Sequence, residues 1–415
     1  MQADTNLRVN GDRLWDSLME MAQIGATAKG GVKRLTLTDL DRESRDLFAR
    51  WGAAAGCTLR VDRMGSMFLR RAGVDDTLPP VIIGSHLDTQ PTGGKFDGAL
   101  GVLAALEIVR TLQDLDIKTK HPIEIVNFTN EEGSRFAPAM VASGVAAGLF
   151  DLEYGLSRQD EDGKQLGDEL ERIGYAGDMA VGGRPFHAFL EAHIEQGPFL
   201  EEDGVDIGVV TLANGQKWYE ITIEGFESHA GPTPMTRRRD ALLGAAAVIE
   251  KVNEIGMAHQ PGGCATVGMI NSEPNSRNVI PGKVFLTVDF RHPDLAHLEA
   301  MDAALREAVA EICKRRDVTA ELDQIFDTAP LDFDLRCVAA VRGAAEKLGL
   351  SHRDVTSGAG HDAVHMGMVG PAAMVFTPCV DGISHNELED MKKEWAEAGA
   401  SVLLHAALEL AEVVG

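Results

Sequence analysis

The sequence is short of cysteine pairs, of positive charge and of long apolar runs, and each shortage excludes a class of protein. The five cysteines are scattered and no CxxC pair occurs, which argues against a disulfide framework and a thiolate zinc site. Lysine and arginine total 39 against 64 acidic residues, and the net charge of -25 argues against nucleic-acid and anionic-membrane partners. No run approaches the roughly 20 apolar residues that span a bilayer, and the N-terminus lacks an apolar signal-peptide core. We therefore predict a soluble, cytoplasmic protein.

The chain is long enough for more than one domain. Its 415 residues are 44% hydrophobic, and single cores rarely grow beyond roughly 250–300 residues. The pattern of predicted elements changes near residue 214 and changes back near residue 330. We therefore predict one domain formed by residues 1–213 and 330–415, with a second domain of residues 214–329 inserted into it.

The outer domain has the pattern of an α/β sheet flanked by helices. Residues 12–23 and 38–54 are amphipathic and predict helices. An apolar strand ending in "GSHLDT", a helix of small residues and a second apolar strand ending in "NEEG" follow in that order. This order predicts a twisted, mainly parallel sheet with helices on its faces. Ligands of such sheets collect at the carboxyl ends of the strands, where both motifs fall.

The inserted domain alternates strands and helices in a different order. Residues 214–329 predict the succession β-α-β-β-α-β, in which "CATVGMI" and "NVIPGKVFLTVDFRHP" form the two middle strands. This is the order of a split-βαβ, ferredoxin-like α+β module. A helix and a buried strand of the outer domain resume after it.

Candidate functional residues gather in glycine-rich stretches that follow apolar strands. Four of the 13 histidines lie there: His86, His193, His229 and His385. Asp88 lies two residues after His86 on an extended segment, so it faces the same way and can hold the His86 ring by its far nitrogen.

Acidic residues in the same stretches complete a set of ligands for a metal centre. The glycines of "TQPTGGKF" let the chain turn back so that Asp97 can reach the strand end. Imidazoles and carboxylates bind Zn²⁺, Mn²⁺ or Co²⁺, and one carboxylate commonly bridges two ions. The set is His86, Asp97, Glu131 or Glu132, His193 and His385. The adjacent acids can converge only if the strand ends before them, because strand side chains alternate between faces.

Six motifs together resemble one enzyme family. "GSHLDTQPTGGKFDGALGVLAALE", "NEEGSRFAPAMVASG", "HIEQGPFLE", "SHAGPTPM", "NSRNVIPGK" and "SGAGHDA…ISHNE" are similar to the hydantoinase/carbamoylase family of M20 metallopeptidase-like amidohydrolases. That family includes N-carbamoyl-L-amino acid hydrolases, β-ureidopropionases and allantoate amidohydrolases. The resemblance implies two divalent ions per subunit (Zn²⁺, Mn²⁺, Co²⁺ or Ni²⁺). It also implies a homodimer in which the inserted domain is both lid and dimerisation surface.

The resemblance also divides the roles among the residues of the metal centre. It makes His86 and His193 ligands of one ion, Glu132 and His385 ligands of the other, and Asp97 the bridge between them. Glu131 is then the general base, because a carboxylate that binds no metal keeps a lone pair free for the proton of water. Asp88 joins the catalytic set as the support of His86.

Residues outside the metal centre suggest the substrate. Gln196 can donate and accept hydrogen bonds to a ureido group, and Arg291 is the cation that a carboxylate substrate needs in so acidic a protein. The resemblance adds His229, which would stabilise the oxyanion together with metal, and Asn278, which would lie around the substrate. It gives the backbone of Gly360 a contact with the substrate carboxylate, and it implies that some lid residues reach the partner subunit's site. His361 fits a site role and a structural role equally well.

The implied reaction removes the N-carbamoyl group from N-carbamoyl-L-amino acids or N-carbamoyl-β-alanine, giving the free amino acid, carbon dioxide and ammonia. Allantoate amidohydrolase is the nearest alternative, and an exopeptidase fits less well. A catalytically dead, ligand-binding relative would lack a ligand or the base, whereas all five ligands and Glu131 are present here.

Overall fold

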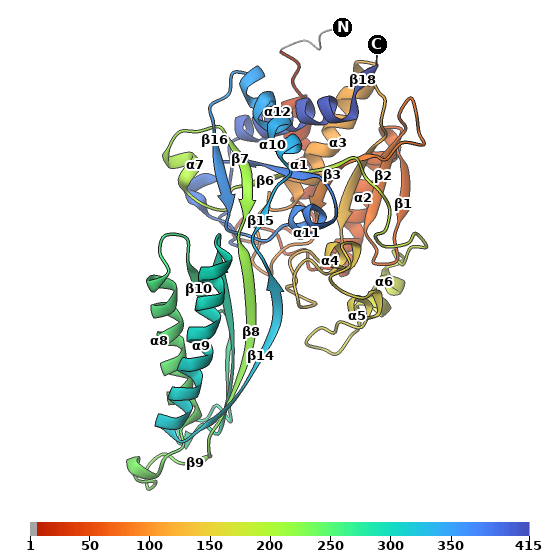
Figure 1. The fold of residues 1–415 in the computed structure, drawn as a ribbon. Helices are drawn as coiled ribbons and strands as arrows, with labels where there is room; N and C mark the ends of the chain where they lie inside the picture. The colour runs from red at the N-terminus through yellow and green to blue at the C-terminus, as the bar shows by residue number, and fades with distance from the viewer. Residues whose placement is uncertain (1–5, 415) are drawn as a thin grey trace. The chain divides into compact units, whose positions relative to one another are not determined.

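The computed structural model describes residues 6–414 and divides the chain into two compact units (Figure 1). The first unit combines the chain up to Thr211 with the chain from Asp332 onward, and the second is Leu212–Leu331. These divisions lie close to the boundaries predicted after residues 213 and 329.

The first unit is built on a large sheet with a parallel centre. Its four central strands run parallel in the order β5-β3-β6-β17, with the antiparallel pair β1-β2 beside β5 and the antiparallel β7 beside β17. The predicted mainly parallel sheet flanked by helices is therefore confirmed. The strands are β1 (Thr58–Val61), β2 (Met67–Arg71), β3 (Val81–His86), β5 (Ile123–Phe128), β6 (Ala188–Ile194), β7 (Ile207–Ala213), β15 (Leu331–Asp332), β16 (His352–Ser357) and β17 (Ala372–Thr377), with β4 (Lys118–Thr119) and β18 (Val413–Val414) paired separately.

Every residue of the four central strands is buried, as expected for parallel strands covered on both faces. Helices α3 and α12 contact these strands and each other. The helices of the unit are α1 (Gly11–Met21), α2 (Asp39–Ala54), α3 (Ala99–Asp114), α4 (Val141–Ala146), α5 (Leu152–Leu156), α6 (Leu166–Ile173), α7 (Phe199–Glu202), α10 (Leu335–Lys347), α11 (Asp362–Val369) and α12 (Lys393–Ala411), with the 3-10 turn η2 (Val380–Gly382).

The first two helices begin where their capping residues place them. The side chain of Asn10 accepts a hydrogen bond from the amide of Arg13, and that of Thr38 accepts one from the amide of Asp41. The helices predicted over 12–23 and 38–54 therefore form with ends shifted by at most two residues. Across residues 6–414, no helix has both the length and the apolar character that crossing a membrane requires.

The second unit is an antiparallel sheet with the strand order β10-β13-β8-β14, in which β11 also pairs with β13. This is the connectivity of a split-βαβ module. The two long helices pack on each other and on the sheet, and they bury an apolar core between them. The elements are β8 (Gly215–Glu224), β9 (Ser228–His229), η1 (Met235–Arg237), α8 (Ala241–Ala258), β10 (Cys264–Thr266), β11 (Ile270–Glu273), β12 (Val279–Ile280), β13 (Lys283–His292), α9 (Leu295–Arg316) and β14 (Thr319–Thr328).

Both middle strands of this unit were predicted as continuous, and both are interrupted. The first consists of β10 and β11, which pair with different parts of β13. The second breaks around Pro281, because proline has no N–H to donate to a strand ladder. The two residues before the break form β12, which pairs with β9 instead of continuing β13.

Candidate metal centre

The predicted metal ligands converge at the carboxyl ends of the parallel strands of the first unit. His86 is the last residue of β3, and His193 is the next-to-last residue of β6. Asp97 lies between two groups of ligands and offers one oxygen to each. Its Oδ1 is 3.1 Å from His193 Nε2 and 3.6 Å from His86 Nε2, while its Oδ2 is 3.4 Å from His385 Nε2. Glu132 Oε2 is also 3.4 Å from His385 Nε2 and completes the second group.

The adjacent acids lie beyond the strand that leads to them. Strand β5 ends at Phe128, and the backbone turns at Asn130 and Gly133, whose φ angles are 60° and 64°. Glu131 Oε2 lies 3.5 Å from His86 Nε2, and Glu132 faces His385. The two acids therefore reach one site from neighbouring positions, as the sequence required.

Asp88 holds the His86 ring, but through its main chain. The main-chain oxygen of Asp88 lies 2.9 Å from His86 Nδ1, whereas the nearest carboxylate oxygen is 3.8 Å away. The Asp88 carboxylate instead accepts hydrogen bonds from the amides of Glu131 and Glu132, at 3.3 and 3.2 Å, and from the Thr36 hydroxyl at 2.7 Å. This corrects the prediction that the Asp88 carboxylate holds the His86 ring. The side chain orients the two acids because their turn leaves both amides without a strand partner.

The charges of this cluster match positive ions. Burial raises the pKa of Glu131 well above its usual value, and the nearby carboxylates of Asp362 and Glu132 add to the shift. Burial and Asp97 raise the pKa of Glu132 to about 8. Burial would also raise the pKa of Asp97, but hydrogen bonds from His193 and His385 outweigh it and hold that pKa well below its usual value. Buried carboxylates that repel one another beside imidazoles suit divalent cations, so these residues fit a metal centre.

The two imidazoles of the first group differ in how burial and Asp97 affect their protonation. Burial lowers the pKa of His86, and neutral imidazole is the form that binds a metal. Burial likewise opposes protonation of His193, but its hydrogen bond with Asp97 raises its pKa to about 9. A cation between these side chains would take over the role of that proton.

Several supporting residues were not predicted. Gln90 donates to both carboxylate oxygens of Glu132, from its amide at 3.1 Å and from its side chain at 2.6 Å. Glu389 is buried and accepts hydrogen bonds from the amides of Phe96 and Asp97. Gln90 lies in "HLDTQPT" and Glu389 in "SHNELED", each four residues after a candidate histidine. This position was the only sequence signal that could have indicated a supporting role.

Gln196 and His361 lie beside the ligands. Gln196 Nε2 donates to Asp97 Oδ2 at 2.9 Å, and its buried Oε1 has no hydrogen-bond partner within residues 6–414. The buried His361 ring meets the His193 ring edge-on at 4.5 Å, and it forms a third close group with His193 and Glu191. Gly360 precedes it in the loop between β16 and α11.

Comparison with known proteins identifies the family. Residues 82–409 match the model of peptidase family M20/M25/M40. The chain belongs to this family. It is 56% identical to an N-carbamoyl-L-amino-acid amidohydrolase of Rhizobium meliloti over 99% of this chain and 98% of that protein. It is 34% identical to the allantoate amidohydrolase of Bacillus subtilis, covering 95% and 97% of the two chains. The crystal structure of a hydantoinase/carbamoylase family amidase from Burkholderia vietnamiensis shares 64% identity over 99% of both chains, with a TM-score of 0.97.

Three further candidates of this M20 family chain lie in the second unit, at two separate places. His229 pairs with Val279 in the β9-β12 ribbon, and the main-chain oxygen of Asn278 accepts from the amide of Ala230. Arg291 lies near the other end of β13, opposite Gln216, and pairs with Asp289 at 2.7 Å. Figure 1 shows β9 and β10, which flank these two places, at opposite ends of the unit. The eight residue-to-residue steps of β13 from Lys283 to Arg291 span about 26 Å, so one copy of this unit does not bring all three residues together.

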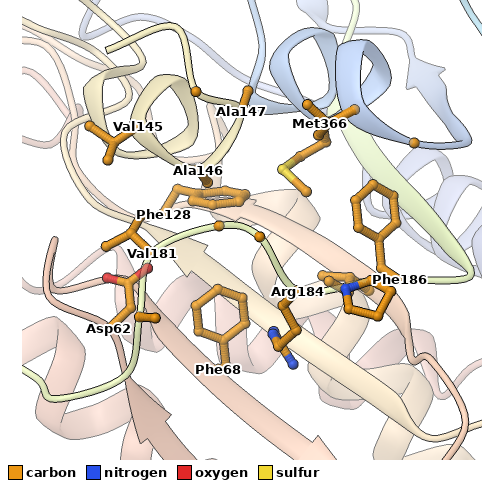
Figure 2. Close-up of a pocket in the computed structure, with 18 of the residues that line it drawn as sticks. Asp62, Phe68, Phe128, Val145, Ala146, Ala147, Val181, Arg184, Phe186 and Met366 are labelled. Atoms are coloured by element: carbon orange, nitrogen blue, oxygen red, sulfur yellow. The ribbon is translucent and has the colours of Figure 1, made fainter. Parts of the chain in front are cut away.

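The first unit also contains a hollow of about 700 Å³ that holds none of the candidate residues among those that line it. Its lining is mainly apolar, with Asp62 and Arg184 as its charged members (Figure 2). The Arg184 guanidinium lies over the Phe68 ring at 5.0 Å and pairs with Glu124 at 2.6 Å. The charge of Arg184 is therefore already paired within the first unit.

Proposed function

We propose that this protein is a metal-dependent amidohydrolase that removes the N-carbamoyl group from N-carbamoyl-L-amino acids or N-carbamoyl-β-alanine. One observation carries the proposal: Asp97 divides its two oxygens between two groups of ligands, and Glu131 stands beside them. The 56% identity to an N-carbamoyl-L-amino-acid amidohydrolase supports this substrate class.

His86 and His193 would hold one divalent ion, Glu132 and His385 the second, and Asp97 would bridge them. Mixed imidazole and carboxylate ligands suit Zn²⁺, Mn²⁺, Co²⁺ or Ni²⁺. When bound, such ions polarise a carbonyl group and make water more acidic.

Glu131 would serve as the general base. Its carboxylate removes a proton from the water that attacks the ureido carbonyl, and it delivers this proton to the departing nitrogen. Ammonia leaves, and the remaining carbamate decomposes to carbon dioxide and the free amino acid. Gln196 would orient the ureido group through its Oε1, which has no hydrogen-bond partner within residues 6–414, and the backbone of Gly360 would contact the substrate carboxylate. Asp88 would keep the Glu131 turn in place through its two amide contacts.

We propose that the inserted unit is the lid and the dimerisation surface of a cytoplasmic homodimer. In this arrangement Arg291 would bind the substrate carboxylate, and His229 and Asn278 would complete a different active site. The supporting observation is that the β9-β12 ribbon and Arg291 lie at opposite ends of the unit, farther apart than the length of a carbamoyl amino acid. All five cysteines are free thiols, which suits a reducing compartment.

An ammonia-release assay tests the proposed reaction. The purified protein is loaded with Mn²⁺, Co²⁺ or Zn²⁺ and given N-carbamoyl-L-methionine, N-carbamoyl-β-alanine, allantoate or a dipeptide. We expect ammonia from one or both carbamoyl amino acids at a higher kcat/KM than from allantoate, and no cleavage of the dipeptide. A preference for allantoate would replace the proposal with the allantoate alternative. No turnover of any substrate by metal-loaded protein would indicate a ligand-binding relative.

A further inference from the structure

Glu389 connects two of the chain segments that supply candidate ligands from outside regular secondary structure. Asp97 lies in the loop between β3 and α3, and His385 lies between η2 and α12. The Glu389 side chain is 1% exposed. Its Oε1 accepts hydrogen bonds from the amides of Phe96 and Asp97, at 2.9 and 3.1 Å. One buried carboxylate therefore fixes the main chain of Asp97 to the segment that carries His385.

The other oxygen of Glu389 reaches the Asp97 side chain through Ser384. Ser384 Oγ lies 2.9 Å from Glu389 Oε2 and 3.0 Å from Asp97 Oδ2. A hydroxyl has one proton, so it donates to one carboxylate at a time while remaining in contact with both. Gln196 Nε2 also donates to Asp97 Oδ2. Asp97 Oδ2, the oxygen that faces His385, is therefore fixed by hydrogen bonds to Ser384 and Gln196, and Ser384 in turn contacts Glu389. Asp97 Oδ1 then faces His86 and His193.

Gly94 shows how closely this carboxylate is enclosed. A Cβ atom on Gly94 would lie 2.0 Å from both Cδ and Oε1 of Glu389, and the three nearest atoms all belong to that carboxylate. The φ angle of Gly94 lies outside the left-handed range, so its backbone conformation does not by itself require glycine. The close approach of the Glu389 carboxylate is what leaves no room for a side chain at this position.

We propose that Glu389 is a positioning residue that holds Asp97 in the orientation in which each oxygen faces one group of ligands. This inference rests on the proposed metal centre, because it assigns Glu389 its effect through the bridging ligand. Residues that orient metal ligands typically contribute 10–100-fold to metal affinity.

Metal affinity measured by chelator competition, with metal content and the melting temperature of the metal-free protein, tests the proposal. We expect Glu389→Ala to lower the affinity roughly 10–100-fold. Glu389→Gln should recover much of this loss, because its amide oxygen can accept from the two main-chain amides and its NH₂ can donate to Ser384. Gly94→Ala should also weaken binding, since it displaces Glu389, but it should add little in the Glu389→Ala background.

Three results would overturn the proposal. These are unchanged affinity in Glu389→Ala despite a lower melting temperature, no recovery in Glu389→Gln, and fully additive losses in the double variant. Asp97→Ala separates this failure from that of the metal centre itself. If Asp97→Ala loses metal and Glu389→Ala does not, only the positioning role is wrong. If both keep metal, the proposed centre is wrong as well.

Discussion

Gly98 lies against the imidazole ring of His86 so closely that no side chain fits between them. A Cβ atom at residue 98 would approach three atoms of that ring to within 2.5 Å. The φ angle of Gly98 is 65°, a conformation that side-chain-bearing residues rarely adopt. Its amide nitrogen also lies 3.2 Å from His193 Nε2. Gly98 is therefore fitted between the two imidazoles of one group of candidate ligands.

Gly98→Ala should displace His86 and weaken metal binding. We expect at least a 10-fold lower affinity, the size typical of a misplaced ligand, and a parallel loss of activity. Titration of the metal-free protein with Zn²⁺ against a chelator measures it. Gly343→Ala is the matched control, because Gly343 lies in α10 with open space at its Cβ position. That change should leave metal affinity unaltered and add up to about 1 kcal/mol of stability. If both variants bind metal with equal affinity, the close contact between Gly98 and His86 does not matter for metal binding.

Glu131→Gln should abolish turnover without emptying the site. An amide cannot take the proton of water, and general bases contribute roughly 10²–10⁴-fold to rates. Metal content should remain near normal because Glu131 is not assigned as a ligand. Glu132→Gln is the comparison one residue away, and it should lose metal together with activity. Ammonia release and elemental analysis of both variants check this division of roles. The assignment is wrong if Glu131→Gln keeps its kcat, or if the two variants lose metal equally.

Asp88→Asn should disturb the two acids more than it disturbs His86. The main-chain oxygen that contacts His86 remains, whereas the carboxylate that accepts from Glu131 and Glu132 becomes an amide. We expect a kcat lower by roughly 10-fold or more, as for other residues that orient metal ligands. Thr36→Val removes one contact to the same carboxylate and should have a smaller effect. A loss in Thr36→Val as large as in Asp88→Asn would show that the Asp88 contacts to the acids are unimportant.

Arg291→Lys should weaken substrate binding and leave the metal unaffected. A lysine supplies a point charge, whereas the guanidinium can bind a carboxylate through two parallel hydrogen bonds. We expect KM for a carbamoyl amino acid to rise roughly 10-fold, in line with the 1.5–3 kcal/mol of a hydrogen bond to a charged group. Steady-state kinetics and metal content test this. Unchanged KM would show that Arg291 does not bind the substrate carboxylate.

The central sheet and the convergence of the candidate ligands could be predicted from sequence because their signals are local. Apolar runs mark β3 and β5, and the candidate ligands lie at the ends of strands or in the loops that follow them. The break between β12 and β13 could also have been inferred, because Pro281 interrupts the strand pattern. Its consequence, the separate pairing of β12 with β9, depends on distant residues and left no local signal.

The supporting contacts were less predictable because they join distant segments. Asp88 and His86 are two residues apart, which correctly suggested a contact, but spacing does not distinguish a main-chain oxygen from a carboxylate. The Glu389 contact to Asp97 spans 292 residues and involves main-chain amides, which any sequence provides. Only the three-dimensional path of the chain selects which amides meet which acid.

Asp62 provides a pH-dependent test that is independent of the metal centre. Burial raises the pKa of Asp62 to about 7, although its Oδ1 accepts hydrogen bonds from the amides of Met64 and Ser66. In the unfolded chain an aspartate titrates near 3.9, so between about pH 4 and pH 7 the folded state binds the extra proton. Stability therefore falls as pH rises through this window, by an amount on the order of a few kcal/mol.

Asp62→Asn should remove this dependence, because asparagine stays neutral and keeps the oxygen that accepts both amides. We expect the melting temperature of Asp62→Asn to rise relative to the wild type between pH 5 and pH 8. Asp178→Asn is the control. Asp178 is exposed and directly precedes Met179, which lines the same hollow. This change should show no such trend in the melting temperature. If Asp62→Asn is less stable than the wild type by a similar margin at both pH values, Asp62 does not gain a proton on folding in this range.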